Sequence, residues 1–193
     1  MVISSSHIYS KGNLEVVKTS TANKINVKKF SQNGQIQIYQ SSYRGSYTSI
    51  IRDSLRNAAL GRKVLLIQFM KGGVKQGVDN AVRLCGNLTW VRSSHSFDQY
   101  TSEATENNNN LKESIHESTF ELWNFCKKEL QSGNNDQIIL DEIFLAIEMK
   151  IIDKDDLIST LENRFISGDV ILTGTDIPKD LLLLANQITE LRS

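Results

Sequence analysis

The run Ile138-Ile139-Leu140-Asp141-Glu142 decides the fold class of this chain. Its three apolar residues predict a buried strand, and two acidic residues then lie at the carboxyl end of that strand. Carboxylates in such a place hold Mg²⁺ in many proteins that bind phosphates. Without a metal, Asp141 would cap the following helix and Glu142 would lie in its first turn. Other parts of the sequence are needed to distinguish a metal site from a helix cap.

Outward from this run, two hydrophobic periods alternate along the chain. Short β-branched or apolar runs predict strands at residues 35–39, 63–69, 88–92, 137–140 and 170–173. Apolar residues three and four apart predict helices at residues 48–60, 80–85, 111–130, 143–147, 155–165 and 179–185. Strands that alternate with helices pair in parallel, so the sequence predicts an α/β fold with a mostly parallel sheet and helices on both faces. Ligands of such sheets bind at the carboxyl ends of the strands.

Length and composition favour one ordinary domain. The chain has 193 residues, of which 39% are hydrophobic, and a formal net charge of zero. We expect a single domain at residues 35–193 and, before it, an N-terminal extension of uncertain order at residues 1–34, with weak strand-like patches at 14–18 and 24–30. No apolar run reaches the roughly 18 residues of a membrane span and no secretory signal is recognisable, so we expect a cytoplasmic protein without a membrane partner.

The two cysteines and the charge distribution exclude some functions. Cys85 and Cys126 have no metal-ligand spacing and are expected to be buried, reduced thiols. Residues 1–79 carry 12 basic and 3 acidic residues, whereas residues 80–193 carry 10 basic and 19 acidic residues. This asymmetry suits an anion-binding first half that packs on an acidic second half. Basic runs interleaved with aromatic residues are missing from the sequence, so nucleic acid is not an expected partner.

The connection between the strand at 35–39 and the helix at 48–60 is the second candidate site. Backbone N–H groups and the helix dipole attract anions to such a corner. A phosphate-binding loop also needs glycines, a lysine for the outer phosphates and a hydroxyl for magnesium. Here Gly45 is the one glycine, and Ser46 stands where the lysine belongs. An ordinary connection capped by Thr48 fits the local sequence as well.

Several motifs together resemble the P-loop ATP:corrinoid adenosyltransferases over residues 34–193. They are Gly61-Arg62-Lys63-Val64-Leu65-Leu66-Ile67-Gln68-Phe69-Met70-Lys71-Gly72, then Gly77, Leu140-Asp141-Glu142, Ile171-Leu172-Thr173-Gly174, and Ala185 with Thr189-Glu190-Leu191. The resemblance implies a P-loop NTPase-like α/β fold and a role in cobalamin metabolism. That family transfers the 5′-deoxyadenosyl group of ATP to the Co(I) atom of a corrinoid. It therefore implies ATP and Mg²⁺ as cofactors, a corrinoid as substrate and a possible homodimer.

The same resemblance implies the site residues. Nucleotide binding falls to the loop and to one arginine of the next helix, namely Ser41, Ser42, Tyr43, Arg44, Gly45, Ser46, Tyr47, Thr48 and Arg56. Metal binding falls to Asp141, Glu142 and Thr48. Phe97 is the candidate for an aromatic lid over the corrinoid. No catalytic side chain is assigned, because Co(I) is itself a strong nucleophile and needs a well-placed ribose carbon rather than a base.

The departures from the family pattern leave two functions open. The family's phosphate loop reads Gly-Asn-Gly-Lys-Gly-Lys-Thr-Thr, whereas residues 41–48 read Ser-Ser-Tyr-Arg-Gly-Ser-Tyr-Thr. A serine cannot replace the charge-assisted contact of the lysine, although Arg44 compensates in part. One function is an adenosyltransferase with a degenerate Walker A loop. The alternative is a non-catalytic binding or regulatory protein descended from that family.

Overall fold

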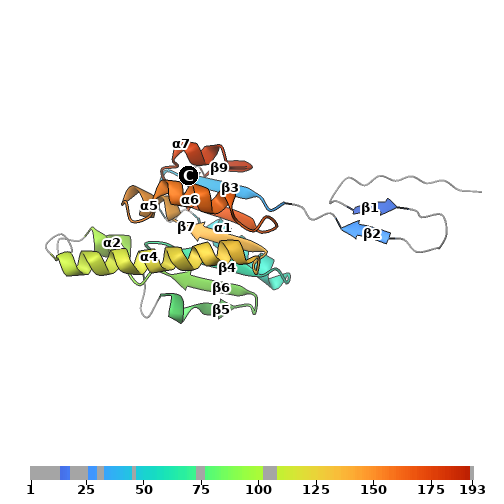
Figure 1. The fold of residues 1–193 in the computed structure, drawn as a ribbon. Helices are drawn as coiled ribbons and strands as arrows, with labels where there is room; N and C mark the ends of the chain where they lie inside the picture. Colours follow the sequence, from blue (N-terminus) through green and yellow to red (C-terminus); the bar gives the residue numbers. More distant parts are fainter. Residues whose placement is uncertain are drawn as a thin grey trace, which may run out of the picture. The chain divides into compact units, whose positions relative to one another are not determined.

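The computed structural model describes residues 14–17, 26–29, 33–44, 47–72, 77–101 and 108–191. The chain divides into two compact units, Met1–Asn33 and Gly34–Ser193 (Figure 1). In the first unit, β1 (Leu14–Val17) and β2 (Asn26–Lys29) pair in antiparallel fashion. Both strands lie within the strand-like patches that the sequence predicts. All further elements belong to the second unit.

The described part of the second unit holds a seven-stranded sheet in the order β5-β6-β4-β7-β8-β3-β9. Its strands are β3 (Ile36–Ser41), β4 (Val64–Gln68), β5 (Val82–Leu84), β6 (Leu88–Arg92), β7 (Gln137–Asp141), β8 (Asp169–Gly174) and β9 (Gln187–Leu191). Its helices are α1 (Thr48–Ala59), the 3₁₀ helix η1 (Val78–Asn80), α2 (Phe97–Tyr100), α4 (Asn109–Ser132), α5 (Ile143–Glu148), α6 (Lys154–Glu162) and α7 (Lys179–Leu182). Only the pair of β5 and β6 is antiparallel among these strands. The predicted α/β class, P-loop NTPase-like and with a mostly parallel sheet, is confirmed.

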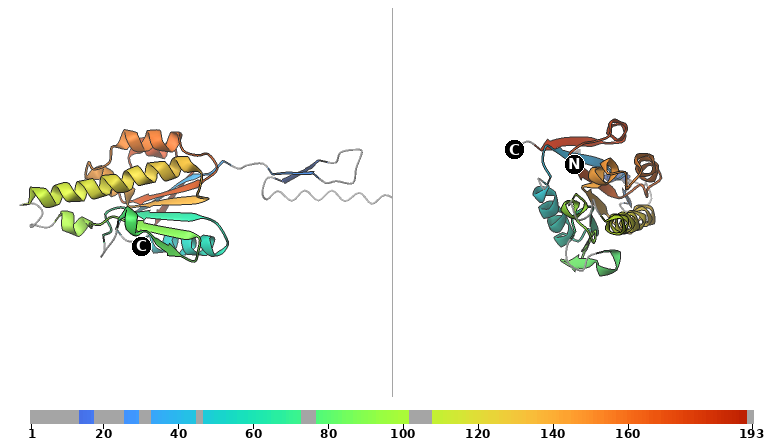
Figure 2. Two further views of the ribbon diagram at one scale, coloured as in Figure 1. Left: turned by 60° about the horizontal axis from the view of Figure 1, so that its bottom comes forward. Right: turned by 90° about the vertical axis from the view of Figure 1, so that its left-hand side faces the viewer.

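Helices cover both faces of the sheet, as the right-hand view of Figure 2 shows. On one face, Ile50 and Ala58 of α1 pack into a cluster with Leu66, Ile139 and Ile171 of three strands. On the other face, α4, α5, α6 and α7 close a larger cluster with inward-facing strand residues. Because β4 and β7 are buried on both faces, their residues are apolar almost throughout. That continuous apolar pattern is why the sequence predicts these strands correctly.

The strand order places the two candidate corners at one edge of the sheet. The strand β3, which precedes the loop at residues 41–48, lies between β8 and β9. On the side of β8 that does not face β3, the strand β7 pairs with β8, and β7 ends in Asp141. The strand β8 therefore separates the acidic end of β7 from the loop after β3, and the carboxyl end of β8 lies between them.

The helix predicted at residues 80–85 is wrong. The structure has η1 and the short strand β5 there, followed by a tight hairpin turn into β6. Cys85 and Gly86 both adopt positive φ, at 50° and 74°, which a helix does not allow. Glycine followed by asparagine between two short strands is a hairpin signal. The same turn leaves Cys85 exposed, so the expectation of a buried thiol holds only for Cys126.

The sequence also misses β9 and extends two helices too far. The helix predicted at 155–165 ends at Glu162, and the one predicted at 179–185 ends at Leu182. The strand β9 is an edge strand whose residues are mostly exposed, so its hydrophobic pattern is weak. Among the described helices, none combines the length and the apolar character of a membrane span.

Candidate functional site

Three polar side chains stand in a row at the carboxyl edge of the sheet. Pairing places Gln68 of β4 opposite Asp141 of β7. The pairing of Leu140 with Leu172 continues to Asp141 and Thr173 at the next position of β7 and β8. Because side chains alternate along a strand, all three share the face that α1 covers. The sheet register therefore brings these groups together.

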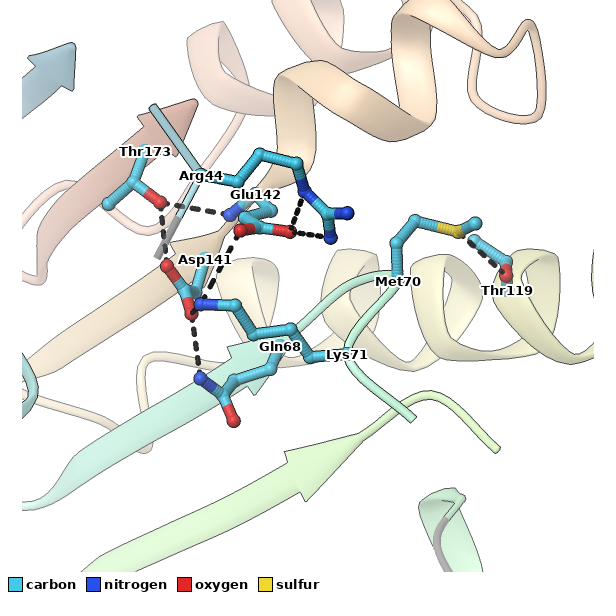
Figure 3. A network of polar contacts seen from close by, with 8 residues as sticks. All are labelled: Arg44, Gln68, Met70, Lys71, Thr119, Asp141, Glu142 and Thr173. Carbon is cyan, nitrogen blue, oxygen red and sulfur yellow. Dashed lines mark hydrogen bonds and ion pairs between the residues drawn. The ribbon is translucent and has the colours of Figure 1, made fainter. Parts of the chain in front are cut away.

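Asp141 is bonded at both carboxylate oxygens (Figure 3). Its Oδ2 accepts hydrogen bonds from Nε2 of Gln68 at 2.7 Å and from Nζ of Lys71 at 2.8 Å. Its Oδ1 accepts one from Oγ1 of Thr173 at 2.8 Å. The residue is only 1% exposed, and a buried carboxylate is tolerated only when it is paired and hydrogen-bonded. The protein itself supplies everything that this carboxylate needs.

Glu142 completes the acidic end of β7. Its backbone N–H donates to Oγ1 of Thr173 at 2.9 Å, and its φ of 61° turns the chain into α5. Its Oε2 accepts hydrogen bonds from Arg44, at 2.6 Å from Nη2 and 3.2 Å from Nε. Its Oε1 lies 3.5 Å from Nζ of Lys71. The two carboxylates thus face two cations, so the charges of this corner balance.

A left-handed turn aims Lys71 back at the acids. Met70 has a φ of 52°, and its buried side chain lies against α4, where Oγ1 of Thr119 donates to Sδ at 3.7 Å. A non-glycine residue in this conformation costs about 1–2 kcal/mol. The turn reverses the chain after β4, so that Lys71 reaches Asp141 although its side chain keeps 25% exposure. Backbone strain and packing on α4 therefore set the position of the ammonium group.

The network continues from Gln68 to the next strand. Nε1 of Trp90 donates to Oε1 of Gln68 at 2.9 Å. This contact orients the amide so that its Nε2 donates to Asp141. The guanidinium carbon of Arg92 lies 4.7 Å from the centre of the Trp90 ring, within the range of a cation–π contact. Residues of four neighbouring strands are thus linked to one carboxylate.

Tyr47 brings the loop into the same corner. It precedes α1 and is 1% exposed, which makes it one of the largest fully buried side chains. Burial, then the charge of Glu142, then that of Asp141 raise the pKa of its phenol to about 12, although backbone groups of Ser41 and Gly174 lower it in part. The phenol therefore lies among the ends of β3 and β8, close enough to feel both carboxylates.

The structure brings together some of the predicted site residues. Arg44 and Tyr47 meet Asp141 and Glu142, and Ser41 is buried at the end of β3. Four other predicted nucleotide-binding residues are exposed, namely Ser42, Tyr43, Thr48 and Arg56. Arg56 lies eight residues after Thr48 on α1, or about 12 Å along the helix axis. Gly45, Ser46 and the side chain of Phe97 lie outside the described part of the chain.

Three residues of the network have no role in the sequence-based prediction. Gln68, Lys71 and Thr173 all contact Asp141, and all three belong to the motifs that carry the family resemblance. A signal for two of them existed, since Gln68 and Thr173 are polar residues at the ends of apolar strands that meet at one edge. Lys71 gives no such signal, because its position depends on the turn at Met70.

A mostly parallel sheet with an acidic strand end and a strand-to-helix loop at the same edge defines an α/β protein of the P-loop NTPase-like class. A family model described as ATP:corrinoid adenosyltransferase BtuR/CobO/CobP matches residues 32–193. The chain belongs to this family. The family's description names ATP and a corrinoid as the molecules on which its members act.

Curated relatives agree with the family at low identity. The chain is 26% identical over 162 residues to the corrinoid adenosyltransferase of Escherichia coli strain K12, covering 83% of this chain and 78% of that protein. It is 26% identical over 161 residues to the corrinoid adenosyltransferase CobA of Salmonella typhimurium strain LT2, with the same coverage of 83% and 78%. It is 23% identical over 186 residues to a corrinoid adenosyltransferase of a Sinorhizobium species, covering 90% of this chain and 79% of that protein.

Proposed function

We propose that this chain is a non-catalytic member of its family, a binding or regulatory protein that does not transfer the adenosyl group of ATP. One observation carries the proposal: Asp141 and Glu142, the predicted metal ligands, are engaged by Lys71 and Arg44 at 2.8 and 2.6 Å. In this arrangement the acidic corner is an internal ion-pair network. Both oxygens of Asp141 and Oε2 of Glu142 accept hydrogen bonds from the protein's own side chains, whereas Oε1 of Glu142 has no hydrogen-bond partner among the described residues.

The side chains as arranged do not fit Mg²⁺. The ion prefers oxygen ligands in near-octahedral geometry at about 2.0–2.1 Å. Both oxygens of Asp141 already accept hydrogen bonds, and two of the groups around the pair are cations. Metal entry would have to displace Lys71 from Asp141 and leave its ammonium next to a second positive charge. Coulomb repulsion at such distances opposes that exchange.

The loop offers little to a triphosphate. Ser46 stands in the place of the lysine that reaches the outer phosphates, and Arg44 is committed to Glu142. A triphosphate brings several negative charges to a corner whose charges are already balanced. We therefore expect weak Mg·ATP binding, and no step of adenosyl transfer is assigned to a residue of this chain.

An active adenosyltransferase is the second candidate, and the start of α1 favours it. The first turn of α1 contains no acidic residue, and within the described part of the chain no side chain makes a capping hydrogen bond to it. Its N-terminal N–H groups and the positive end of its dipole thus keep their attraction for an anion. Under this candidate, Arg44 and Lys71 exchange the carboxylates for phosphate oxygens when nucleotide binds.

A transfer assay separates the two candidates. The purified chain is incubated with Mg·ATP and cobalamin under strongly reducing conditions, and adenosylcobalamin is followed by its absorbance, with the E. coli relative as positive control. We expect no product from this chain. Isothermal titration with Mg·ATP, with cobalamin and with both then shows which ligand is retained. Product formation that the substitution Asp141→Asn abolishes would establish the second candidate.

A further inference from the structure

We propose that the Tyr47 side chain is a built-in occupant of the corner in which phosphate-binding loops hold their metal ion, and that it keeps divalent cations out. The inference deepens the proposed non-catalytic function and rests on it. It assigns the exclusion of metal to one residue rather than to the loop as a whole.

The first step is the position of Tyr47 in the sequence pattern. In the pattern G-x-x-x-x-G-K-[ST], the hydroxyl residue directly follows the lysine and binds Mg²⁺. Gly45-Ser46-Tyr47 stands at the last three positions, so Tyr47 replaces the metal-binding hydroxyl residue. Thr48, the residue to which the family resemblance assigns metal binding, is exposed at the start of α1. The pattern and the burial together point to Tyr47 as the residue that faces the metal position.

The second step is the place of the phenol among the strand ends. Tyr47 packs with Ile50 of α1 and with Ile139 and Ile171 of β7 and β8. The side chain therefore belongs to the cluster between α1 and the sheet, which includes a residue of β7, the strand that ends in Asp141. The raised pKa, about 12, reflects burial first and then Glu142 and Asp141. Both acids therefore lie near the phenol.

The third step separates steric from electrostatic exclusion. Lys71 and Arg44 neutralise the carboxylates, but their side chains are 25% and 33% exposed and are able to swing into solvent. The Tyr47 side chain is 1% exposed and belongs to a buried hydrophobic cluster, so its movement is restricted. Of the two obstacles, only the ring is permanent. We therefore assign metal exclusion to the ring.

Titration with Mn²⁺, followed by electron paramagnetic resonance of the free ion, tests this assignment. We expect the unmodified chain and Tyr47→Phe to bind Mn²⁺ only at the level of non-specific surface sites, because both keep the ring. Tyr47→Thr should bind one Mn²⁺ at least about tenfold more tightly, a gain of about 1.4 kcal/mol. Equal binding by Tyr47→Thr and Tyr47→Phe, or tight binding by the unmodified chain, overturns the assignment.

A second variant keeps the test decisive if Tyr47→Thr does not fold, which circular dichroism shows. The double substitution Arg44→Ala with Lys71→Ala removes the cations and leaves the ring. We expect this variant to gain no Mn²⁺ site. A tenfold gain there shows that charge, not the ring, excludes the metal, and the assignment is then wrong.

The two proposals fail separately. Adenosylcobalamin formed by the unmodified chain overturns the proposed function whatever the Mn²⁺ titration shows. A folded Tyr47→Thr variant without a Mn²⁺ site overturns only the role of Tyr47. In that case the chain remains a non-catalytic family member whose metal exclusion has another cause.

Discussion

Two strand-to-helix corners meet at the same edge of the sheet and differ in the contacts that stabilise them. The corner from β7 to α5 holds two acids: Asp141 accepts hydrogen bonds from three side chains, and Glu142 accepts two from Arg44. The corner from β3 to α1 has the loop Ser-Ser-Tyr-Arg-Gly-Ser-Tyr-Thr at residues 41–48, in which Tyr47 is buried and Arg44 bonds to Glu142. The difference teaches that the two corners are stabilised in different ways, the acidic corner by ion pairs and hydrogen bonds and the loop corner by burial of an aromatic ring.

The free-energy cost of breaking a buried ion pair explains why we expect the acidic corner to stabilise the fold. Removing one partner of a buried ion pair leaves an uncompensated charge, which costs more than the pair itself contributes. Asp141 has three partners, from two neighbouring strands and the loop after β4, so its replacement disturbs all of them. We therefore expect the acidic corner to contribute to the stability of the folded chain, whether or not a ligand binds there. The predictions that follow test this account of the two corners.

The largest expected effect is on Asp141. Asp141→Ala leaves Gln68, Lys71 and Thr173 without their shared acceptor, and we expect a loss of about 3 kcal/mol in the free energy of unfolding. Urea denaturation measures it. The control is Asp98→Ala, because Asp98 is exposed and its replacement should stay within about 0.5 kcal/mol. Equal losses for the two variants would mean that the acidic corner contributes nothing to stability.

At the loop corner, the raised pKa of Tyr47 predicts that the free energy of unfolding depends on pH. The folded pKa of about 12 lies above the ordinary value of 10.0, so the stabilising contribution is complete below pH 10 and is lost as the pH rises toward 12. Each unit corresponds to about 1.4 kcal/mol, so the free energy of unfolding should fall by roughly 2–3 kcal/mol over that interval. In Tyr47→Phe this part of the fall disappears. Identical pH profiles for both proteins would place the phenol outside the corner.

Arg44 joins the two corners and has a smaller expected effect. Arg44→Ala removes both hydrogen bonds to Oε2 of Glu142, but the arginine is one-third exposed and water replaces part of the interaction. We expect a loss of about 1–2 kcal/mol, measured by urea denaturation. Arg52→Ala is the matched control, since Arg52 is 77% exposed and should change stability by less than about 0.5 kcal/mol. A loss no larger than that of the control would mean that the contact between Arg44 and Glu142, which joins the two corners, does not stabilise the fold.

The sequence predicts the fold well where strands are buried on both faces. The interior strands β4 and β7 are continuous apolar runs, and the structure confirms them. The edge strands β5 and β9 are mostly exposed and carry no such signal, so β9 is missed and β5 is predicted as helix. The hydrophobic pattern does not reveal the edge strands, because their exposed side chains need not be apolar.

The candidate site is predictable only in part, for a different physical reason. Asp141 and Glu142 follow from the strand pattern. The contact between Lys71 and Asp141 joins residues 70 positions apart and depends on the positive φ of Met70. No local hydrophobic pattern signals a left-handed turn at a methionine. Burial of Tyr47 is equally a tertiary property, because an exposed loop tyrosine such as Tyr43 has the same local sequence character.

The smallest expected effect lies at the far end of the network, at Trp90. Trp90→Phe keeps most of the ring packing but removes the donor to Oε1 of Gln68. We expect a loss of about 1 kcal/mol in the free energy of unfolding, the net value of one neutral hydrogen bond. If the network is cooperative, the loss shrinks when Asp141 is already replaced by alanine, because the orientation of Gln68 then has no consequence. A double-mutant cycle between Trp90→Phe and Asp141→Ala measures this coupling. If the two losses in the free energy of unfolding are strictly additive, Trp90 contributes through packing alone and its hydrogen bond to Gln68 is not coupled to Asp141.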